Sequence, residues 1–161
     1  MHLRFISFLL ILTLLNCSDN NNVVKYKSFK YGWFSDEKVK FKFKLKQVEE
    51  NNLFIHLRNN NDYKFSNIFL IAILRDSNSV IFHDTLEYKM ANLYGEWMGK
   101  GFSNIKENRL WWKEKWKPNH KGPYFIEIAQ ATRENGSISG VRILDGILDI
   151  GLTLDYKTID K

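Results

Sequence analysis

Apolar and lysine side chains alternate with a period of two from residue 39, and this pattern constrains the fold more than any other feature of the chain. Successive side chains of a β-strand point to opposite faces, so the alternation is typical of a strand with one buried face and one solvent face. A row of lysines also protects a sheet edge from pairing with other chains. We therefore predict a half-buried edge strand. Its apolar residues are Val39, Phe41, Phe43 and Leu45, and they alternate with Lys40, Lys42, Lys44 and Lys46.

Short runs of β-forming residues, separated by turn signals, follow along the rest of the chain. Residues 68–74 are apolar on both faces, which is typical of a central strand. Further strands are predicted at 53–58, 80–83, 124–129 and 147–154, with turns at 50–52, 59–62, 75–79 and 135–136. The pattern predicts an all-β fold, a single antiparallel β-sandwich of the jelly-roll type, with roughly seven to nine strands over residues 26–161.

Two segments leave the local structure open. Residues 84–104 are less regular and contain three glycines. Residues 107–117 contain Trp112 and Trp116, which lie on one side both in a strand and in a helix with i,i+4 spacing. Pro118 ends this element in either case.

The start of the chain has the order of a secretory signal. Arg4 precedes an apolar run over 5–15, which ends just before Cys17, the only cysteine in the chain. The run is about half the roughly 20 residues needed to span a bilayer. We predict a lipoprotein signal peptide over 1–16, lipidation of Cys17 and a polar tether over 17–25, so that the bilayer is a partner through the lipid. No disulfide can form.

Composition and the residue after the lipidated cysteine bear on location and partners. Ser18 stands where the best-known inner-membrane retention signal has Asp, so we predict the outer membrane and leave the leaflet open. The formal net charge of +6 could suggest nucleic acid, but the export signal argues against that partner. Attraction to anionic lipid headgroups is an alternative use of the basic charge.

No residue pattern predicts an enzyme, a metal site or a cofactor. The chain contains no nucleophile elbow and no phosphate loop. Asp84 and Glu87 could form a glycosidase pair, but their odd separation in a strand points them to opposite faces. The spacing of His56, His83 and His120 fits no metal-ligand motif.

The loop from Gly95 to Gly101 is the predicted partner-contact element. Its glycines, Gly95, Gly99 and Gly101, permit unusual backbone shapes, and Trp97 and Lys100 between them combine an apolar anchor with a charge. The alternative is that Trp97 folds back into the core. If residues 107–117 form a strand, Trp111 lies with Lys113, Lys115 and Lys117 on a basic face that could contact sugar or protein. The other interpretation is that the Trp111 ring packs beneath a loop.

Several segments together resemble the gliding motility lipoprotein GldH family of Bacteroidota. They are Tyr31-Gly32-Trp33, residues 57–63, residues 66–70, residues 84–91, Gly95-Glu96-Trp97-Met98-Gly99-Lys100-Gly101, residues 130–133 and residues 144–152. Thr132 and Pro123 depart from the family pattern locally. The resemblance implies an envelope lipoprotein needed for gliding and linked to type IX secretion, with other lipoproteins and envelope proteins of that machinery as partners and no known reaction. A lectin-like, polysaccharide-binding lipoprotein is the alternative.

Overall fold

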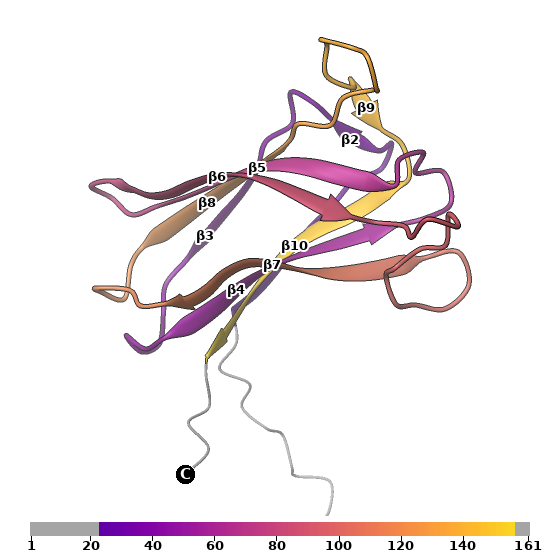
Figure 1. Cartoon of the computed structure of the whole chain (residues 1–161). Coiled ribbons are helices and arrows are strands. Elements are labelled where there is room, and N and C mark those ends of the chain that lie inside the picture. The colour runs from indigo at the N-terminus through magenta and orange to yellow at the C-terminus, as the bar shows by residue number, and fades with distance from the viewer. Residues whose placement is uncertain (1–22, 157–161) are drawn as a thin grey trace, which may run out of the picture.

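The computed structural model describes residues 23–156, and within this range every regular element is a strand. Ten strands follow one another along the chain (Figure 1). They are β1 (Val23–Ser28), β2 (Trp33–Phe34), β3 (Val39–Phe43), β4 (Asn51–Asn59), β5 (Asn67–Arg75), β6 (Val80–Lys89), β7 (Lys106–Trp116), β8 (Tyr124–Gln130), β9 (Ile143–Leu144) and β10 (Ile147–Tyr156). No helix in this range could cross a membrane.

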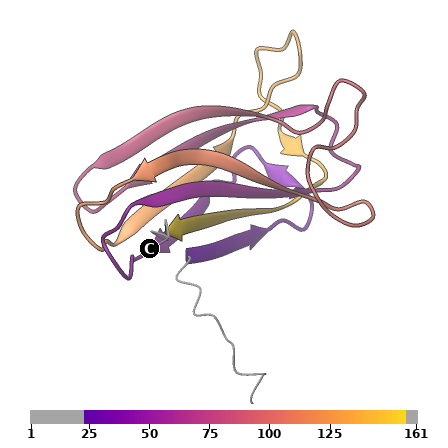
Figure 2. The same cartoon turned by 60° about the horizontal axis from the view of Figure 1, so that its bottom comes forward.

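Eight of these strands build two four-stranded antiparallel sheets. One sheet has the order β1-β10-β4-β7, and the other has the order β3-β8-β5-β6. Figure 2 shows β1, β10, β4 and β7 side by side in that order. The short strands β2 and β9 pair with each other. Two facing sheets with these crossed connections form a jelly roll, so the predicted β-sandwich is confirmed.

The core lies between the two sheets and is formed by alternate residues of each strand. In β3, Val39, Phe41 and Phe43 are buried while Lys40 and Lys42 are exposed, as the alternation predicted. The strand also lies at a sheet edge. The inner faces of the other long strands contribute mainly branched aliphatic side chains, including Leu53, Ile55, Leu57, Ile68, Leu70, Leu74, Ile126, Ile128, Ile150, Leu152 and Leu154.

The ambiguous segment 107–117 forms β7, a strand and not a helix. It pairs with β4 from Asn59↔Lys106 to Asn51↔Trp116, and the register shifts near Leu53 and again near Asn51. Trp112 and Trp116 are both buried and pack into the core. Pairing with β4 selects the strand, because the backbone groups of β4 that point away from β10 find their partners in β7.

The first strand begins earlier than the predicted domain boundary. β1 starts at Val23 and pairs with β10, from Val23↔Leu154 to Ser28↔Asp149. Residues 23–25 therefore belong to the sheet, although the sequence placed them in the tether. Their partner strand lies more than a hundred residues further along the chain, so no local pattern signalled the pairing. The predicted signal peptide and Cys17 lie outside the described residues.

The two ends of the sandwich differ in what they carry. The described chain enters at Val23 and leaves after Tyr156 at one end, called here the tether end (Figure 1). The opposite end, called here the far end, carries the connections 60–66, 90–105 and 131–142. β10 has ten residues and so runs about 30 Å between the two ends.

Candidate functional site

The connection between β6 and β7, residues 90–105, begins with a tight hairpin. Ala91 and Trp97 form an isolated antiparallel bridge. Inside it, Asn92 Oδ1 accepts hydrogen bonds from the backbone N–H groups of Tyr94, at 2.9 Å, and Glu96, at 3.0 Å. Gly95 has a φ of +81° and closes the turn. The hairpin is thus ordered by its own hydrogen bonds, and asparagine and glycine supply the turn.

Trp97 lies half-buried against the body of the sandwich. Its indole Nε1 donates a hydrogen bond of 3.0 Å to Asn61 Oδ1, in the connection between β4 and β5. Its ring centroid lies 6.1 Å from that of Tyr63, whose pKa is raised by burial. The side chain therefore links two connections of the far end. Its position is intermediate between the two interpretations from the sequence, because the ring packs against the core and is also partly exposed.

The other two glycines allow close backbone approach. A Cβ atom on Gly99 would lie 2.7 Å from Oδ1 of the buried Asn108, and one on Gly101 would lie 2.3 Å from the backbone oxygen of Ile105. Between them, Lys100 and Glu107 exchange two backbone hydrogen bonds, of 2.9 and 2.7 Å. Because these glycines have no side chains, the loop can lie close against β7. The side chain of Lys100 is exposed.

Bulky apolar side chains project from the same loop into solvent. Leu93 is fully exposed, and Phe102 is 95% exposed. Tyr94, Met98 and Ile105 are also exposed. These residues were not predicted as contacts from the sequence, although bulky apolar residues inside a glycine-rich segment are a signal that could have identified them. Five exposed bulky apolar side chains within one connection make this loop a candidate contact with another molecule. We call Leu93, Tyr94, Met98, Phe102 and Ile105 the apolar loop cluster.

A hollow of about 570 Å³ lies beside the apolar loop cluster. The loop lines it with Met98, Gly99, Lys100 and Gly101, and the strands line it with His56, Lys89, Glu107, Asn108, Arg109 and Leu110. Asn108 is held in place because its Nδ2 donates to the backbone oxygen of Leu57 and to Asn59 Oδ1.

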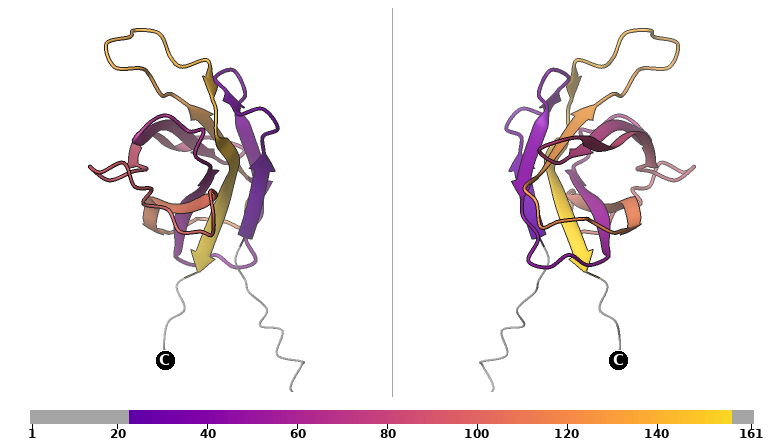
Figure 3. Two further views of the ribbon diagram at one scale, coloured as in Figure 1. Left: turned by 90° about the vertical axis from the view of Figure 1, so that its right-hand side faces the viewer. Right: turned by 90° about the vertical axis from the view of Figure 1, so that its left-hand side faces the viewer.

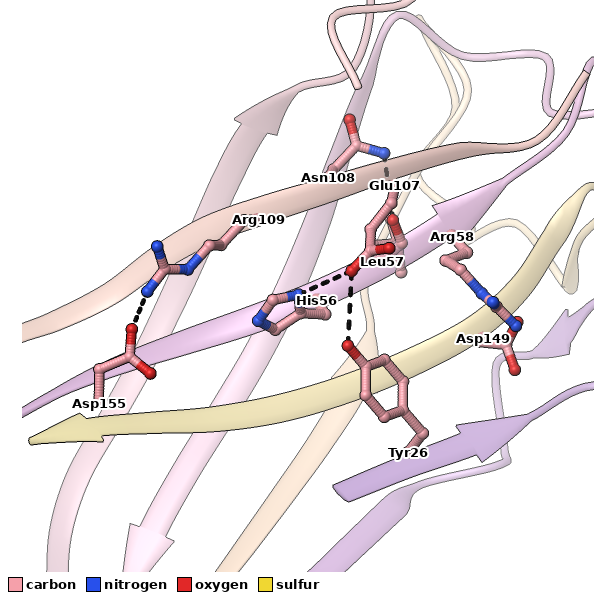
Figure 4. Close-up of polar contacts among 9 residues, drawn as sticks. All are labelled: Tyr26, His56, Leu57, Arg58, Glu107, Asn108, Arg109, Asp149 and Asp155. Atoms are coloured by element: carbon pink, nitrogen blue, oxygen red, sulfur yellow. Dashed lines mark hydrogen bonds and ion pairs between the residues drawn. The ribbon is translucent and has the colours of Figure 1, made fainter. Parts of the chain in front are cut away.

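The polar groups beside this hollow belong to the outer face of the β1-β10-β4-β7 sheet (Figure 4). Glu107 Oε1 lies 3.2 Å from His56 Nδ1 and accepts a long hydrogen bond of 3.5 Å from the Tyr26 hydroxyl. Burial, followed by the charge of Glu107, raises the pKa of Tyr26. The other ring nitrogen of His56, Nε2, is buried without a hydrogen-bond partner among residues 23–156.

Two ion pairs flank this group on the same face. Arg58 donates to Asp149 Oδ2 through Nε at 2.8 Å, and this hydrogen bond raises the pKa of the guanidinium. Arg109 pairs with Asp155 (Figure 4). Each of these two cations thus faces its own carboxylate on this outer face.

Trp111 lies apart from the loop, on the outer face of β7. It is 54% exposed, and its ring lies 4.3 Å from that of Phe54. It is four residues along the strand from Glu107, or about 13 Å. The prediction that Lys113 lies on the same face as Trp111 is wrong. The register shift at Leu53 turns Lys113 toward β6, where its Nζ lies 3.0 Å from Asp84.

The acidic and histidine residues weighed from the sequence are spread over the described part of the chain. Asp84 accepts from Trp112 Nε1 at 2.9 Å, while Glu87, on the other face of β6, accepts from Asn67. His120 lies 3.1 Å from Asp76, at the tether end. Residues 23–156 contain no cluster of three or more His, Cys, Asp or Glu side chains that could hold a metal ion.

Comparison with known proteins places most of the chain in one family. The family model described as GldH lipoprotein matches residues 21–154. The Gliding motility lipoprotein GldH of Flavobacterium johnsoniae is 41% identical, over 94% of this chain and 95% of its own length. The Gliding motility lipoprotein GldH homolog of Christiangramia forsetii is 37% identical, over 96% of this chain and 98% of its own length.

Solved structures are much more distant. The infectious bursal disease virus VP2 subviral particle covers 86% of this chain and 34% of its own chain at 10% identity, with a TM-score of 0.38. The dimeric latent PorU from Porphyromonas gingivalis covers 86% of this chain and 13% of its own, also at 10% identity, with a TM-score of 0.35. Likeness at this level carries no argument about function.

Proposed function

The chain belongs to the GldH lipoprotein family, and from this premise we propose that it is a lipid-anchored envelope component required for gliding motility. Both named relatives are gliding motility lipoproteins. We propose further that the protein supports type IX secretion, lies at the outer membrane and acts through protein contacts without catalysis. The secretion link follows from the family resemblance, and the outer-membrane location follows from Ser18 after the lipidated cysteine.

The lipid on Cys17 is the first part of this proposal. Cys17 is the only thiol of the chain, and only Asn16 separates it from the apolar run, where lipidation requires a cysteine. A radiolabelled fatty acid should enter the wild-type protein and fail to enter Cys17→Ser. The matched control is Ser18→Ala, which leaves the thiol in place and should label normally. Equal labelling of wild type and Cys17→Ser would contradict the anchor.

The apolar loop cluster carries the proposal of a protein contact. Leu93 and Phe102 are almost completely exposed, at the end of the sandwich opposite the tether. Free exposure of such residues lowers solubility, and an apolar partner surface would bury them. A few side chains that enter a partner's pocket supply much of the affinity of protein contacts, and Phe, Tyr and Met are enriched at such interfaces.

Substitution of the cluster tests this contact. The double variant Leu93→Ser and Phe102→Ser should unfold at the wild-type temperature, because both side chains lie in solvent. The same variant, expressed in place of the wild-type gene, should abolish colony spreading and reduce type IX secretion. The matched control is Val80→Ser, which removes an exposed apolar side chain where β6 begins, at the other end of the strand. Normal spreading of the double variant would contradict the contact.

A polysaccharide-binding role is the alternative, and one observation favours it. Tyr31 is 70% exposed beside a hollow of about 760 Å³ at the far end. Asn60, Asn61 and Asp145 also line this hollow, and amide and carboxylate groups beside an exposed ring can bind sugar. Calorimetry with envelope polysaccharide should detect binding that Tyr31→Ala removes. Absence of heat with the wild-type protein would exclude this alternative.

A further inference from the structure

One long edge of the sandwich is lined by lysines. The edge strands β1 and β3, from different sheets, border a groove of about 590 Å³. Its lining includes Lys25, Lys27, Lys38, Lys40 and Lys42, which we call the lysine edge, with Tyr26, Glu37, Val39 and Phe41. All five lysines are exposed. The same side of the molecule therefore carries an elongated row of positive charge.

Two carboxylates neutralise only part of this charge. Glu37 pairs with Lys27 at 3.3 Å, and Glu127 of β8 pairs with Lys38 at 2.9 Å and with Lys40 at 3.7 Å. Five lysines against two glutamates leave a formal charge of +3, half of the +6 of the whole chain. Neither Lys25 nor Lys42 has a carboxylate partner among residues 23–156, and Lys42 lies over the Phe125 ring.

The place where the chain enters the sandwich brings this edge close to the membrane. β1 is the first strand, and it forms one wall of the groove. The six residues 17–22, from the lipidated cysteine to the start of β1, can span at most about 20 Å. The lysine edge is therefore the part of the domain nearest in the chain to the lipid. Val24 and Tyr26 alternate with Lys25 and Lys27 along β1 and are exposed on the outer face of the sheet.

We propose that the lysine edge lies on the anionic headgroups of the bilayer that holds the Cys17 lipid, as a second membrane contact. This inference rests on the proposed lipid anchor. One acyl modification with an adjacent basic patch binds a membrane more firmly than either alone. Each lysine near an anionic surface contributes about 1 kcal/mol at physiological ionic strength.

This contact also orients the far side of the molecule. β1 and β3 are edge strands on one side, and β7 and β6 are the opposite edges of the same two sheets. The connection 90–105 joins β6 to β7, and Figure 3 shows it on the side of the sandwich opposite β1. With the lysine edge on the headgroups, the apolar loop cluster faces away from the membrane and is free to meet a protein partner.

Vesicle sedimentation of the chain from Ser18 to Lys161, which contains every described strand but no lipid, tests the proposal. We expect binding to vesicles of phosphatidylcholine mixed with phosphatidylglycerol, and little binding to phosphatidylcholine alone. Salt should release the protein, because the Debye length falls from about 10 Å at 0.1 M to about 3 Å at 1 M. Equal binding to both kinds of vesicle would overturn the electrostatic contact.

Two triple variants of equal charge distinguish a local contact from a net-charge effect. The variant with Lys25, Lys40 and Lys42 changed to Gln should bind anionic vesicles about 100-fold more weakly, since three lysines contribute about 1 kcal/mol each. The control changes Lys89, Lys100 and Lys115, on the β6–β7 side, to Gln and should bind almost as wild type. Equal loss in both variants would overturn the proposal.

Two further outcomes distinguish the lipid contact from a protein contact and from failure of the anchor. An acidic peptide that binds the lysine edge, with no binding to vesicles, would assign the groove to a protein segment and overturn the lipid contact. The vesicle experiment uses unlipidated protein, so its failure is separate from failure of the anchor. If Cys17 labels with fatty acid but the vesicles do not bind, only the second membrane contact is wrong.

Discussion

At the residue scale, Trp97 fastens the long loop to the body of the sandwich. Its Nε1 donates to Asn61, and its ring packs near Tyr63. We predict that Trp97→Ala lowers the free energy of unfolding by about 2 kcal/mol. This is less than the roughly 3–5 kcal/mol of a fully buried tryptophan, because the ring is only half-buried. Urea unfolding followed by circular dichroism measures the change.

A second substitution separates the two contributions of Trp97. Trp97→Phe keeps an aromatic ring but loses the hydrogen bond to Asn61, so it should cost about 1 kcal/mol. Wild-type stability of Trp97→Ala would show that the loop is held by its backbone alone. The glycines around Trp97 predicted a partner contact or a core position for its ring, but no local pattern signalled its bond to Asn61, which lies in another connection.

The carboxylate of Asp76 makes the stability of the fold depend on pH, because its pKa is lowered in the folded protein. Backbone N–H groups of Asn78, at 2.7 Å, and Ser79, at 2.8 Å, donate to Asp76 Oδ1. These hydrogen bonds, helped by His120, lower the pKa of Asp76 from 3.8 to about 2. Because the folded pKa is the lower one, the stabilisation is present above the unfolded pKa and is lost as the pH falls toward about 2.

We predict that wild type exceeds Asp76→Asn in free energy of unfolding at pH 6, and that the difference shrinks between about pH 4 and pH 2. Asn can still accept from the two N–H groups, so this variant removes the charge and keeps the turn. Urea unfolding over a pH series measures the difference. An NMR titration midpoint of the Asp76 carboxyl near 3.8 would contradict the prediction.

At the element scale, β7 and the loop before it depend on one close contact. Gly99 approaches Asn108, which in turn binds the backbone oxygen of Leu57 in β4. We predict that Gly99→Ala lowers the free energy of unfolding by about 1–3 kcal/mol, because the added Cβ displaces a buried amide from its hydrogen bonds. Thermal unfolding and chemical denaturation measure the effect.

Gly140→Ala is the matched control for this substitution. Gly99 and Gly140 both lack a positive φ, but the Cβ of an alanine at 140 would lie 3.7 Å from its nearest neighbour, the backbone oxygen of Thr132. Its stability should stay within about 0.5 kcal/mol of wild type. Equal losses in the two variants would mean that Asn108 moves aside without cost.

The elements themselves were predictable to different extents. The alternation in β3 specified both the strand and its buried face, because side-chain direction along a strand is a local property. β7 was not predictable to the same extent, since the spacing of Trp112 and Trp116 suits both a helix and a strand. Pairing with β4 decided the matter, and the register shift beside Leu53 turned Lys113 away from the face expected for it.

At the scale of the whole molecule, two edges of one sandwich carry different surfaces. The lysine edge comes from β1 and β3, and the apolar loop cluster comes from the connection between β6 and β7. Each surface contains residues from one or two short stretches of sequence. Their placement on opposite sides follows from the sheet orders β1-β10-β4-β7 and β3-β8-β5-β6, which leave these strands at opposite edges.

The sequence by itself determined the all-β class, the faces of β3 and most turns, because these depend on side-chain period and on residues that favour turns. Only the tertiary structure decided that Val23 begins a strand, that Trp97 meets Asn61 and that lysines of β1 and β3 share a groove. These contacts join residues far apart in the chain. Their geometry depends on strand order and register, which packing of the two sheets selects.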